Sequence, residues 1–178
     1  MVRFLYSLEN IYLRLEKTGS TVRLMFFNFS SAFSTIQPHL LVQKLLNMKL
    51  PASVIYWIFD YLTRRLQYVR LNGLLSSTIS TNTGEPQGTV LALSLFALYT
   101  ADCRSTDESC FLEKIADDTE LVGKNSNDKD ALYHKQTENF VNWCDKNYLY
   151  LNVFKTKENQ RIKDAPNQST LKEKQWRE

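Results

Sequence analysis

Two adjacent carboxylates, Asp117 and Asp118, are the side chains of this sequence best suited to chemistry. They lie between two short apolar runs, 111–115 and 119–122, which predict the strands of a hairpin with the carboxylates at its tip. Because adjacent negative charges repel, a tight turn that holds both of them favours a bound cation. Asp is also common in turns for conformational reasons alone, so the pair by itself leaves an ordinary turn open.

Four other features carry useful groups that a folded sheet could bring into the same cleft. An apolar run over 22–29, typical of a buried strand, ends near Asn28, and Phe33 follows it. The loop 84–88 reads Gly-Glu-Pro-Gln-Gly and precedes an apolar helix, while Lys155 follows a predicted strand. Each feature also has an ordinary interpretation: a core aromatic for Phe33, a plain turn for the loop and a solvated surface lysine for Lys155.

Taken together, four segments resemble the reverse transcriptases of non-LTR (LINE-type) retrotransposons. The segments occur in the order and with the spacing of that family, and they span about residues 20–157. They are Leu-Met-Phe-Phe-Asn-Phe-Ser-Ser-Ala-Phe (24–33), Gly-Glu-Pro-Gln-Gly-Thr-Val-Leu (84–91), Ile-Ala-Asp-Asp (115–118) and Leu-Asn-Val-Phe-Lys-Thr-Lys (151–157). Each segment is modest alone, and the four in order carry the resemblance.

The resemblance implies RNA-templated DNA synthesis by two-metal nucleotidyl transfer. In such sites two Mg²⁺ ions, with Mn²⁺ as an alternative, lie about 3.5–4 Å apart, activate the primer 3′-hydroxyl and stabilise the leaving pyrophosphate. The metal-binding carboxylate pair of the family matches Asp117 and Asp118, with Asp117 the stronger ligand candidate, and the third carboxylate position matches Asn28. The implied partners are an RNA template, a DNA primer and deoxynucleoside triphosphates.

Four further positions take roles from the same resemblance. Lys155 matches a lysine that protonates the leaving pyrophosphate, which is general-acid catalysis. Phe33 matches the bulky residue that excludes a ribose 2′-hydroxyl. Gln87 and Gly88 match the loop that contacts the incoming nucleotide and the template. The expected catalytic set is therefore Asp117, Asp118 and Lys155.

The sequence departs from the family pattern at the first carboxylate position, where Asn28 stands. A neutral amide binds Mg²⁺ through one oxygen and cannot bridge two hard cations as a carboxylate does. Glu85 stands where the family usually has a small residue and is expected to put a like charge near an incoming triphosphate, while Ile115 replaces the usual aromatic. Because fingers, thumb and endonuclease segments are also unmatched, we expect mostly a palm that is catalytically inactive or nearly so.

Two other functions stay open at this point. One is a non-catalytic remnant that binds nucleic acid or protein, and the other is a non-functional product of a decayed element. Residues 1–154 balance 15 Lys/Arg against 15 Asp/Glu, so the net charge of +3 lies wholly in residues 155–178. This distribution predicts weak attraction of the globular part to phosphates.

The elements that must position these groups predict an α+β fold, a polymerase palm with a ferredoxin-like antiparallel sheet and helices packed on one face. Helices are predicted over 3–17, 39–49, 52–65, 89–99 and 127–146, and strands over 22–29, 66–71, 76–83, 111–115, 119–122 and 148–153. Residues 1–157 are thus expected to form a partial reverse transcriptase domain, a palm with part of the fingers. Residues 158–178 are expected to be a disordered basic tail, because the apolar pattern stops there.

Composition agrees with one globular domain. The 178 residues are 43% hydrophobic, which excludes wholesale disorder, and no apolar run approaches the roughly 18 residues of a membrane span. The three cysteines are an odd number without Cys-x-x-Cys spacing, which argues against a disulfide framework and a zinc site. We therefore expect reduced thiols in an intracellular protein of the cytoplasm or nucleus.

Overall fold

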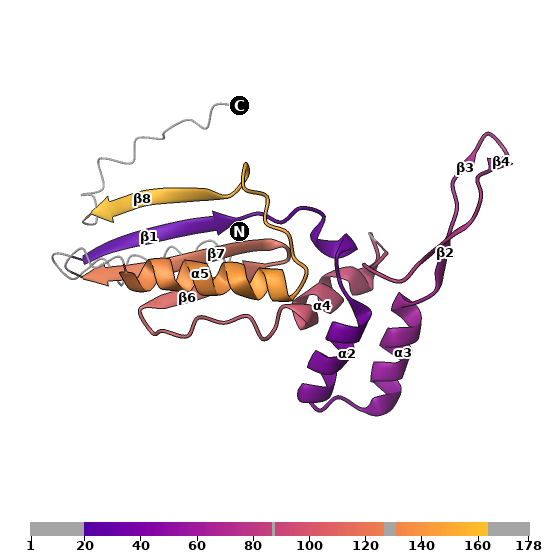
Figure 1. The fold of residues 1–178 in the computed structure, drawn as a ribbon, viewed down its shortest axis with the longest axis horizontal. Coiled ribbons are helices and arrows are strands. Elements are labelled where there is room, and N and C mark those ends of the chain that lie inside the picture. Colours follow the sequence, from indigo (N-terminus) through magenta and orange to yellow (C-terminus); the bar gives the residue numbers. More distant parts are fainter. Residues whose placement is uncertain (1–19, 87, 127–130, 164–178) are drawn as a thin grey trace.

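The computed structural model describes residues 20–86, 88–126 and 131–163. Its centre is a four-stranded antiparallel sheet with the strand order β6-β7-β1-β8 (Figure 1). The strands are β1 (Ser20–Phe27), β6 (Cys110–Ile115), β7 (Asp118–Ser126) and β8 (Lys157–Lys163). The predicted α+β class with an antiparallel sheet is confirmed.

Strand β1 is central because it has apolar residues on both faces. Val22 is buried on one face together with Val122 of β7, and Phe27 is buried on the other. On the Phe27 side, helix α5 (Ala131–Lys146) covers the sheet, and the ring of Phe140 lies 4.2 Å from the ring of Phe27. This contact ties the helix to the end of β1 that carries Asn28.

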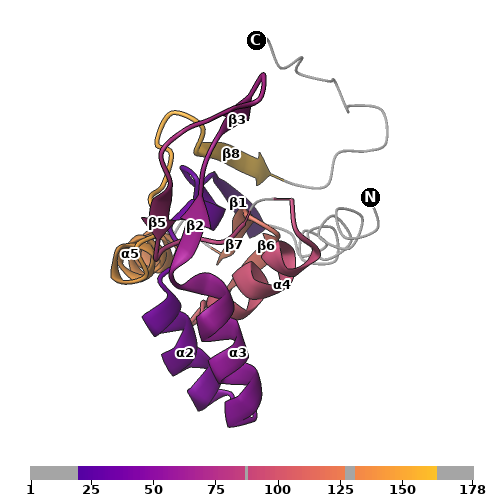
Figure 2. The same ribbon diagram turned by 90° about the vertical axis from the view of Figure 1, so that its right-hand side faces the viewer.

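Three more helices lie beyond the Phe27 end of β1 (Figures 1 and 2): α2 (Pro38–Asn47), α3 (Ala52–Leu62) and α4 (Val90–Tyr99). Their buried side chains join one core with those of the sheet and α5. Lys44 of α2 lies inside this region, and its ammonium donates to the carbonyl of Tyr99 over 2.7 Å and to the carboxylate of Asp102 over 2.6 Å. Two strong acceptors compensate the burial of this charge.

A narrow ribbon of residues 65–81 projects from the end of α3 (Figures 1 and 2), and we call it the arm. In it β2 (Arg65–Gln67) pairs with β5 (Ile79–Thr81), and β3 (Arg70–Leu71) pairs with β4 (Leu74–Leu75). The turn at its tip, Asn72-Gly73, has φ angles of 50° and 82°. Both values are positive, as a type I′ hairpin turn requires, so the predicted hairpin and its turn are confirmed.

The C-terminal part of the fold differs from the sequence prediction. Of the strand expected over 148–153, only Leu151 forms a β-bridge, to Phe29. Residues 158–163, expected to begin a disordered tail, instead belong to β8 and pair with β1. The helix expected over 3–17, the first residues of the helix expected over 127–146 and the tail from residue 164 lie outside the described residues.

Candidate functional site

The two adjacent carboxylates lie at the turn between β6 and β7. Ile115 pairs with Asp118 across the hairpin, so the turn itself consists of Ala116 and Asp117. Ala116 has a φ of 55°, the left-handed value that the first turn residue of a tight hairpin needs. Asp117 is half-buried and Asp118 is exposed. The predicted hairpin with both carboxylates at its tip is therefore present.

Asn28 lies beside this turn. The last residue of β1, Phe27, pairs with Thr119 of β7, and the strands are antiparallel. Asn28 follows Phe27 and Asp118 precedes Thr119, so these two residues are neighbours at the same end of the sheet. The order of the motifs predicts this convergence, and the register of β1 on β7 provides it.

The segment that carries Lys155 lies on the other side of Asn28. The backbone N–H of Asn152 donates to the carbonyl of Asn28 over 2.7 Å, and the N–H of Asn28 donates to the hydroxyl of Thr156 over 3.4 Å. Lys155 itself is exposed. Asn28 therefore stands between the carboxylate turn and the Lys155 segment, so four predicted positions meet at one end of the sheet.

Sequence reasoning missed the part that Asn152 plays in this arrangement. Its side-chain oxygen accepts the backbone N–H of Lys155 over 3.2 Å, and its carbonyl accepts the N–H groups of Lys155 and Thr156. Asn152 thus ends the extended segment in a turn that sets Lys155 next to β1. An Asn three residues before Lys155 is the available signal, because Asn side chains commonly bond the backbone of their own turn.

Phe33 lies further along the chain, in the short 3-10 helix η1 (Ala32–Ser34). It is partly buried, and its ring centroid lies 5.1 Å from that of Phe96 in α4. The backbone N–H of Glu85 donates to the carbonyl of Phe33 over 3.0 Å, and the N–H of Gly84 donates to the carbonyl of Ile36 over 2.7 Å. These two bonds hold the start of the 84–88 loop against the segment that follows β1.

The position of Glu85 contradicts the expectation drawn from the sequence. Its side chain is 5% exposed, and neither carboxyl oxygen has a hydrogen-bond partner among the described residues. Burial raises the pKa of Glu85 to about 8, although the nearby Arg65 acts in the opposite direction. At neutral pH this group is therefore mostly uncharged and packed inside, so it does not present a negative charge to a nucleotide.

The second half of the loop is only partly described. Gln87 lies outside the described residues, and Gly88 is exposed with a φ of 78°. A Cβ at Gly88 would meet no atom within 4 Å, so the backbone there is open to an approaching molecule. Thr89 is the N-cap of α4, but its hydroxyl donates to the carbonyl of Pro86 over 3.0 Å instead of capping the helix.

The side chains at this end of the sheet that could ligate a metal ion are the carboxylates of Asp117 and Asp118 and the amide of Asn28. Among the described residues, no three His, Cys, Asp or Glu side chains form a group that could hold a metal ion. Carboxylates bridge hard cations, whereas an amide gives one neutral oxygen. This set suits a single divalent cation and does not fit the pair on which two-metal nucleotidyl transfer depends.

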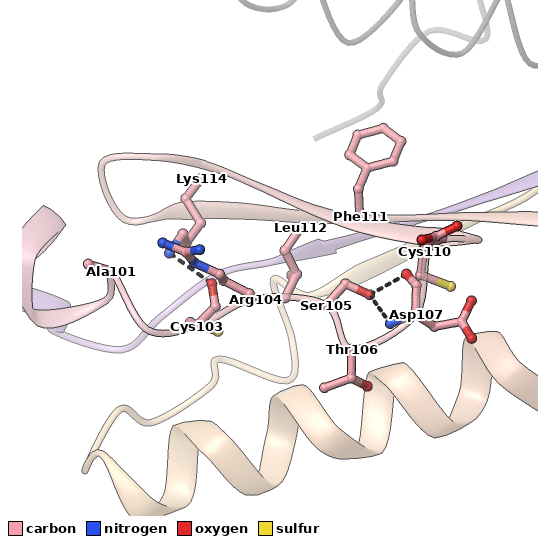
Figure 3. Close-up of a pocket in the computed structure, with 11 residues that line it drawn as sticks. Ala101, Cys103, Arg104, Ser105, Thr106, Asp107, Cys110, Phe111, Leu112 and Lys114 are labelled. Carbon is pink, nitrogen blue, oxygen red and sulfur yellow. Dashed lines mark hydrogen bonds between the residues drawn. The ribbon is translucent and has the colours of Figure 1, made fainter.

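A separate pocket of about 540 Å³ lies between β6 and the loop that follows α4 (Figure 3). Lys114 points toward this loop and donates to the carbonyl of Thr100 and, over 3.1 Å, to that of Cys103. Ser105 donates to the carbonyl of Asp107 over 3.0 Å. Because these groups bond the protein itself, they hold the loop in place, and we assign the pocket no ligand.

The three cysteines, Cys103, Cys110 and Cys144, are all buried free thiols. Burial raises the pKa of Cys103 to about 11, so this thiol stays protonated. Among the described helices, none has the length and apolarity needed to cross a membrane.

Comparison with solved structures shows that this fold is similar to part of telomerase. The apo telomerase of Candida tropicalis truncated from its C-terminal domain matches with a TM-score of 0.66 and 14% identity, over 93% of this chain and 35% of that one. The telomerase of Candida tropicalis in complex with a TWJ fragment of telomeric RNA gives 0.66 and 14%, over 88% of this chain and 28% of that one. This chain therefore spans about a third of the length of those proteins. At such low identity the likeness establishes the reverse transcriptase palm fold alone.

The family comparison covers nearly the whole sequence. A model of the family described as reverse transcriptase (RNA-dependent DNA polymerase) matches residues 4–170. The comparison with curated proteins gives no match. Since the family match includes β1, the 84–88 loop, the carboxylate turn and the Lys155 segment, the chain belongs to the reverse transcriptase family and carries a reverse transcriptase domain.

Proposed function

We propose that this chain is the palm of a reverse transcriptase of the non-LTR (LINE-type) retrotransposon class, and that by itself it does not catalyse DNA synthesis. The supporting observation is the register of β1 on β7, which makes Asn28 the neighbour of Asp118 at the end of the sheet that carries the carboxylate turn. Asn28 then occupies the place of a metal-bridging carboxylate. In this proposal the domain extends through β8, whose pairing with β1 makes it part of the sheet.

The roles of the residues follow from their match to the family. Asp117 and Asp118 bind the divalent cation, and Lys155 donates a proton to a leaving pyrophosphate. Phe33 excludes a ribose 2′-hydroxyl, while Gln87 and Gly88 contact nucleotide and template. The substrates in the parent class are an RNA template, a DNA primer and deoxynucleoside triphosphates. The exposed backbone at Gly88 and the exposed side chain of Lys155 support these assignments.

Loss of activity follows from charge. Reverse transcriptases use divalent metal ions, and Mg²⁺ or Mn²⁺ suits the oxygen donors present here. Asn28 stands where the family has a carboxylate, so the site has one negative charge fewer at the place where two divalent ions would meet. Asp117 and Asp118 would hold a single divalent ion weakly, and without a third carboxylate the site would lack the second ion that the transfer needs.

Primer extension on an RNA template tests this proposal. The unmodified chain and the Asn28→Asp variant are incubated with primer, deoxynucleoside triphosphates and Mg²⁺ or Mn²⁺, beside an active reverse transcriptase as control. We expect no extension by the unmodified chain, because Asn28 would leave the site without the second ion that the transfer needs. Extension by the unmodified chain overturns the proposal. Extension by Asn28→Asp alone shows that the missing carboxylate is the whole defect.

A further inference from the structure

The arm exposes an unusual amount of apolar surface. Seven of its large side chains are between 58% and 77% exposed: Leu66, Tyr68, Val69, Leu71, Leu74, Leu75 and Ile79. The arm is a two-stranded ribbon that projects from the rest of the protein (Figures 1 and 2). An isolated two-stranded ribbon is marginally stable in water, and a large exposed apolar patch indicates a binding surface.

The charge of the arm restricts what can cover it. Residues 61–84 contain three arginines and no Asp or Glu. Arg65 is engaged at the base, where it donates to the carbonyls of Thr83 and Gly84 over 2.7 and 2.8 Å. Arg70, next to the tip, is exposed. Because symmetric pairing of two arms would bring like charges together, the surface that fits the arm is apolar and acidic.

The composition of the arm favours a protein surface over nucleic acid. Six of the seven exposed apolar side chains are aliphatic, and Tyr68 is the one aromatic residue of the arm sequence. Proteins that bind single-stranded nucleic acid rely on aromatic side chains on which bases stack. Exposed leucines are instead suited to an apolar pocket.

The same chain carries an apolar and acidic pocket of about 300 Å³ at the β6–β7 hairpin. We call it the acidic pocket. Phe26 and Ile115 form apolar walls that are 38% and 45% exposed, and Asp118 and Glu120 add carboxylates. Phe26 pairs directly with Glu120 across β1 and β7.

We propose that the arm tip of one copy of this chain inserts into the acidic pocket of a second copy. Leu71 and Leu74 pair across the turn at the tip and would supply the apolar contact, while Arg70 would meet Glu120. The arm does not fill the pocket of its own chain, since both surfaces are exposed in the same molecule. The contact joins unlike surfaces, so it can repeat from copy to copy and covers Asp118 each time.

Sedimentation velocity over a concentration series tests the contact, with nuclease-treated full-length chain at low salt. We expect the unmodified chain to associate beyond dimers as concentration rises and to dissociate as salt is added. Arg70→Glu and Glu120→Lys should each lower the apparent association constant at least about tenfold. Lys135→Glu and Glu138→Lys, the same charge reversals on the exposed face of α5, should leave it unchanged.

A mixture of the two variants gives the decisive result. The Glu120→Lys chain keeps an intact arm and the Arg70→Glu chain keeps an intact pocket, and the two reversed charges also complement each other, so the mixture should associate again although each variant alone associates weakly. If circular dichroism shows that Glu120→Lys does not fold, Ile115→Lys replaces it. An unmodified chain that stays monomeric overturns the proposal, and so does association that Arg70→Glu leaves intact. Association that disappears with nuclease treatment assigns the arm to nucleic acid instead.

Discussion

The backbone N–H of Glu85 donates to the carbonyl of Phe33 over 3.0 Å, while its carboxyl group is buried without a polar partner among the described residues. The backbone bond draws the 84–88 loop inward, and the side chain must follow into a region from which water is excluded. A residue whose type suggests a surface charge thus becomes a buried neutral acid. Glu85 therefore affects the stability of the 84–88 loop and does not change the charge of the candidate site.

Glu85 predicts a pH-dependent stability. Its pKa is about 8 in the folded chain and near 4.5 in an exposed glutamate, so between these values the unfolded chain binds fewer protons. The free energy of unfolding should therefore fall as pH rises through this window, by at most about 1.4 kcal/mol per pH unit, and level off above it. Urea denaturation at a series of pH values measures this slope.

Glu85→Gln removes the titrating group and keeps the shape of the side chain. In this variant the decline of stability between pH 5 and 8 should become clearly shallower. Glu108→Gln, at an exposed position, serves as the matched control and should leave the slope as it is. Equal slopes in the unmodified chain and Glu85→Gln would show that Glu85 keeps an ordinary pKa.

Asn28→Asp predicts a link between stability and divalent ions. The new carboxylate would stand beside Asp118 and near Asp117, so repulsion should lower the melting temperature in the absence of metal. Mg²⁺ or Mn²⁺ should then raise the melting temperature of the variant more than that of the unmodified chain, because binding to the folded state stabilises it. Calorimetric titration should show tighter ion uptake.

The control for this prediction combines Asn28→Asp with Asp117→Asn. That double variant restores the original number of carboxylates, and the added ion affinity should disappear. Ion uptake that is the same in all three chains would place the cation away from this end of the sheet.

The turn between β6 and β7 predicts a stabilising substitution. Ala116 has a φ of 55°, which costs a non-glycine residue about 1–2 kcal/mol. Ala116→Gly relieves this strain but adds flexibility to the unfolded chain, so the net gain should be about 0.5–1 kcal/mol. Ala97→Gly in the exposed part of α4 is the control and should instead lose about 1 kcal/mol. Denaturant midpoints compare the two.

The sequence predicts the parts of this fold that local chemistry determines. Asn72-Gly73 requires a type I′ turn, and the apolar runs around Asp117 require a hairpin, so both were accessible without a structure. Strand β8 could not be predicted from the sequence, because Lys157–Lys163 has no apolar alternation and is held by backbone pairing to β1. The run 148–153 shows the opposite case, since Asn152 ends its extended course in a turn despite apolar neighbours.

Some features of the candidate site could likewise be predicted from the sequence, and others could not. Residue types and order predict that Asn28 meets the carboxylate turn, because adjacent strand ends must converge. The burial of Glu85 depends instead on a long-range contact of the loop with Phe33, which no local pattern reports. For the same reason the complementary surfaces of the arm and the acidic pocket emerge only when the exposure of each side chain is known.

Gly84 and Gly73 provide a matched pair that tests how tightly the 84–88 loop is held. Both have positive φ values, 69° and 82°, so replacement by Ala strains the backbone similarly at each. A Cβ at Gly84 would lie 2.6 Å from the carbonyl oxygen of Ser34, whereas at Gly73 it would meet nothing within 4 Å. Gly84→Ala should therefore cost about 2 kcal/mol more than Gly73→Ala in urea denaturation. Equal losses would mean that the loop does not pack on Ser34.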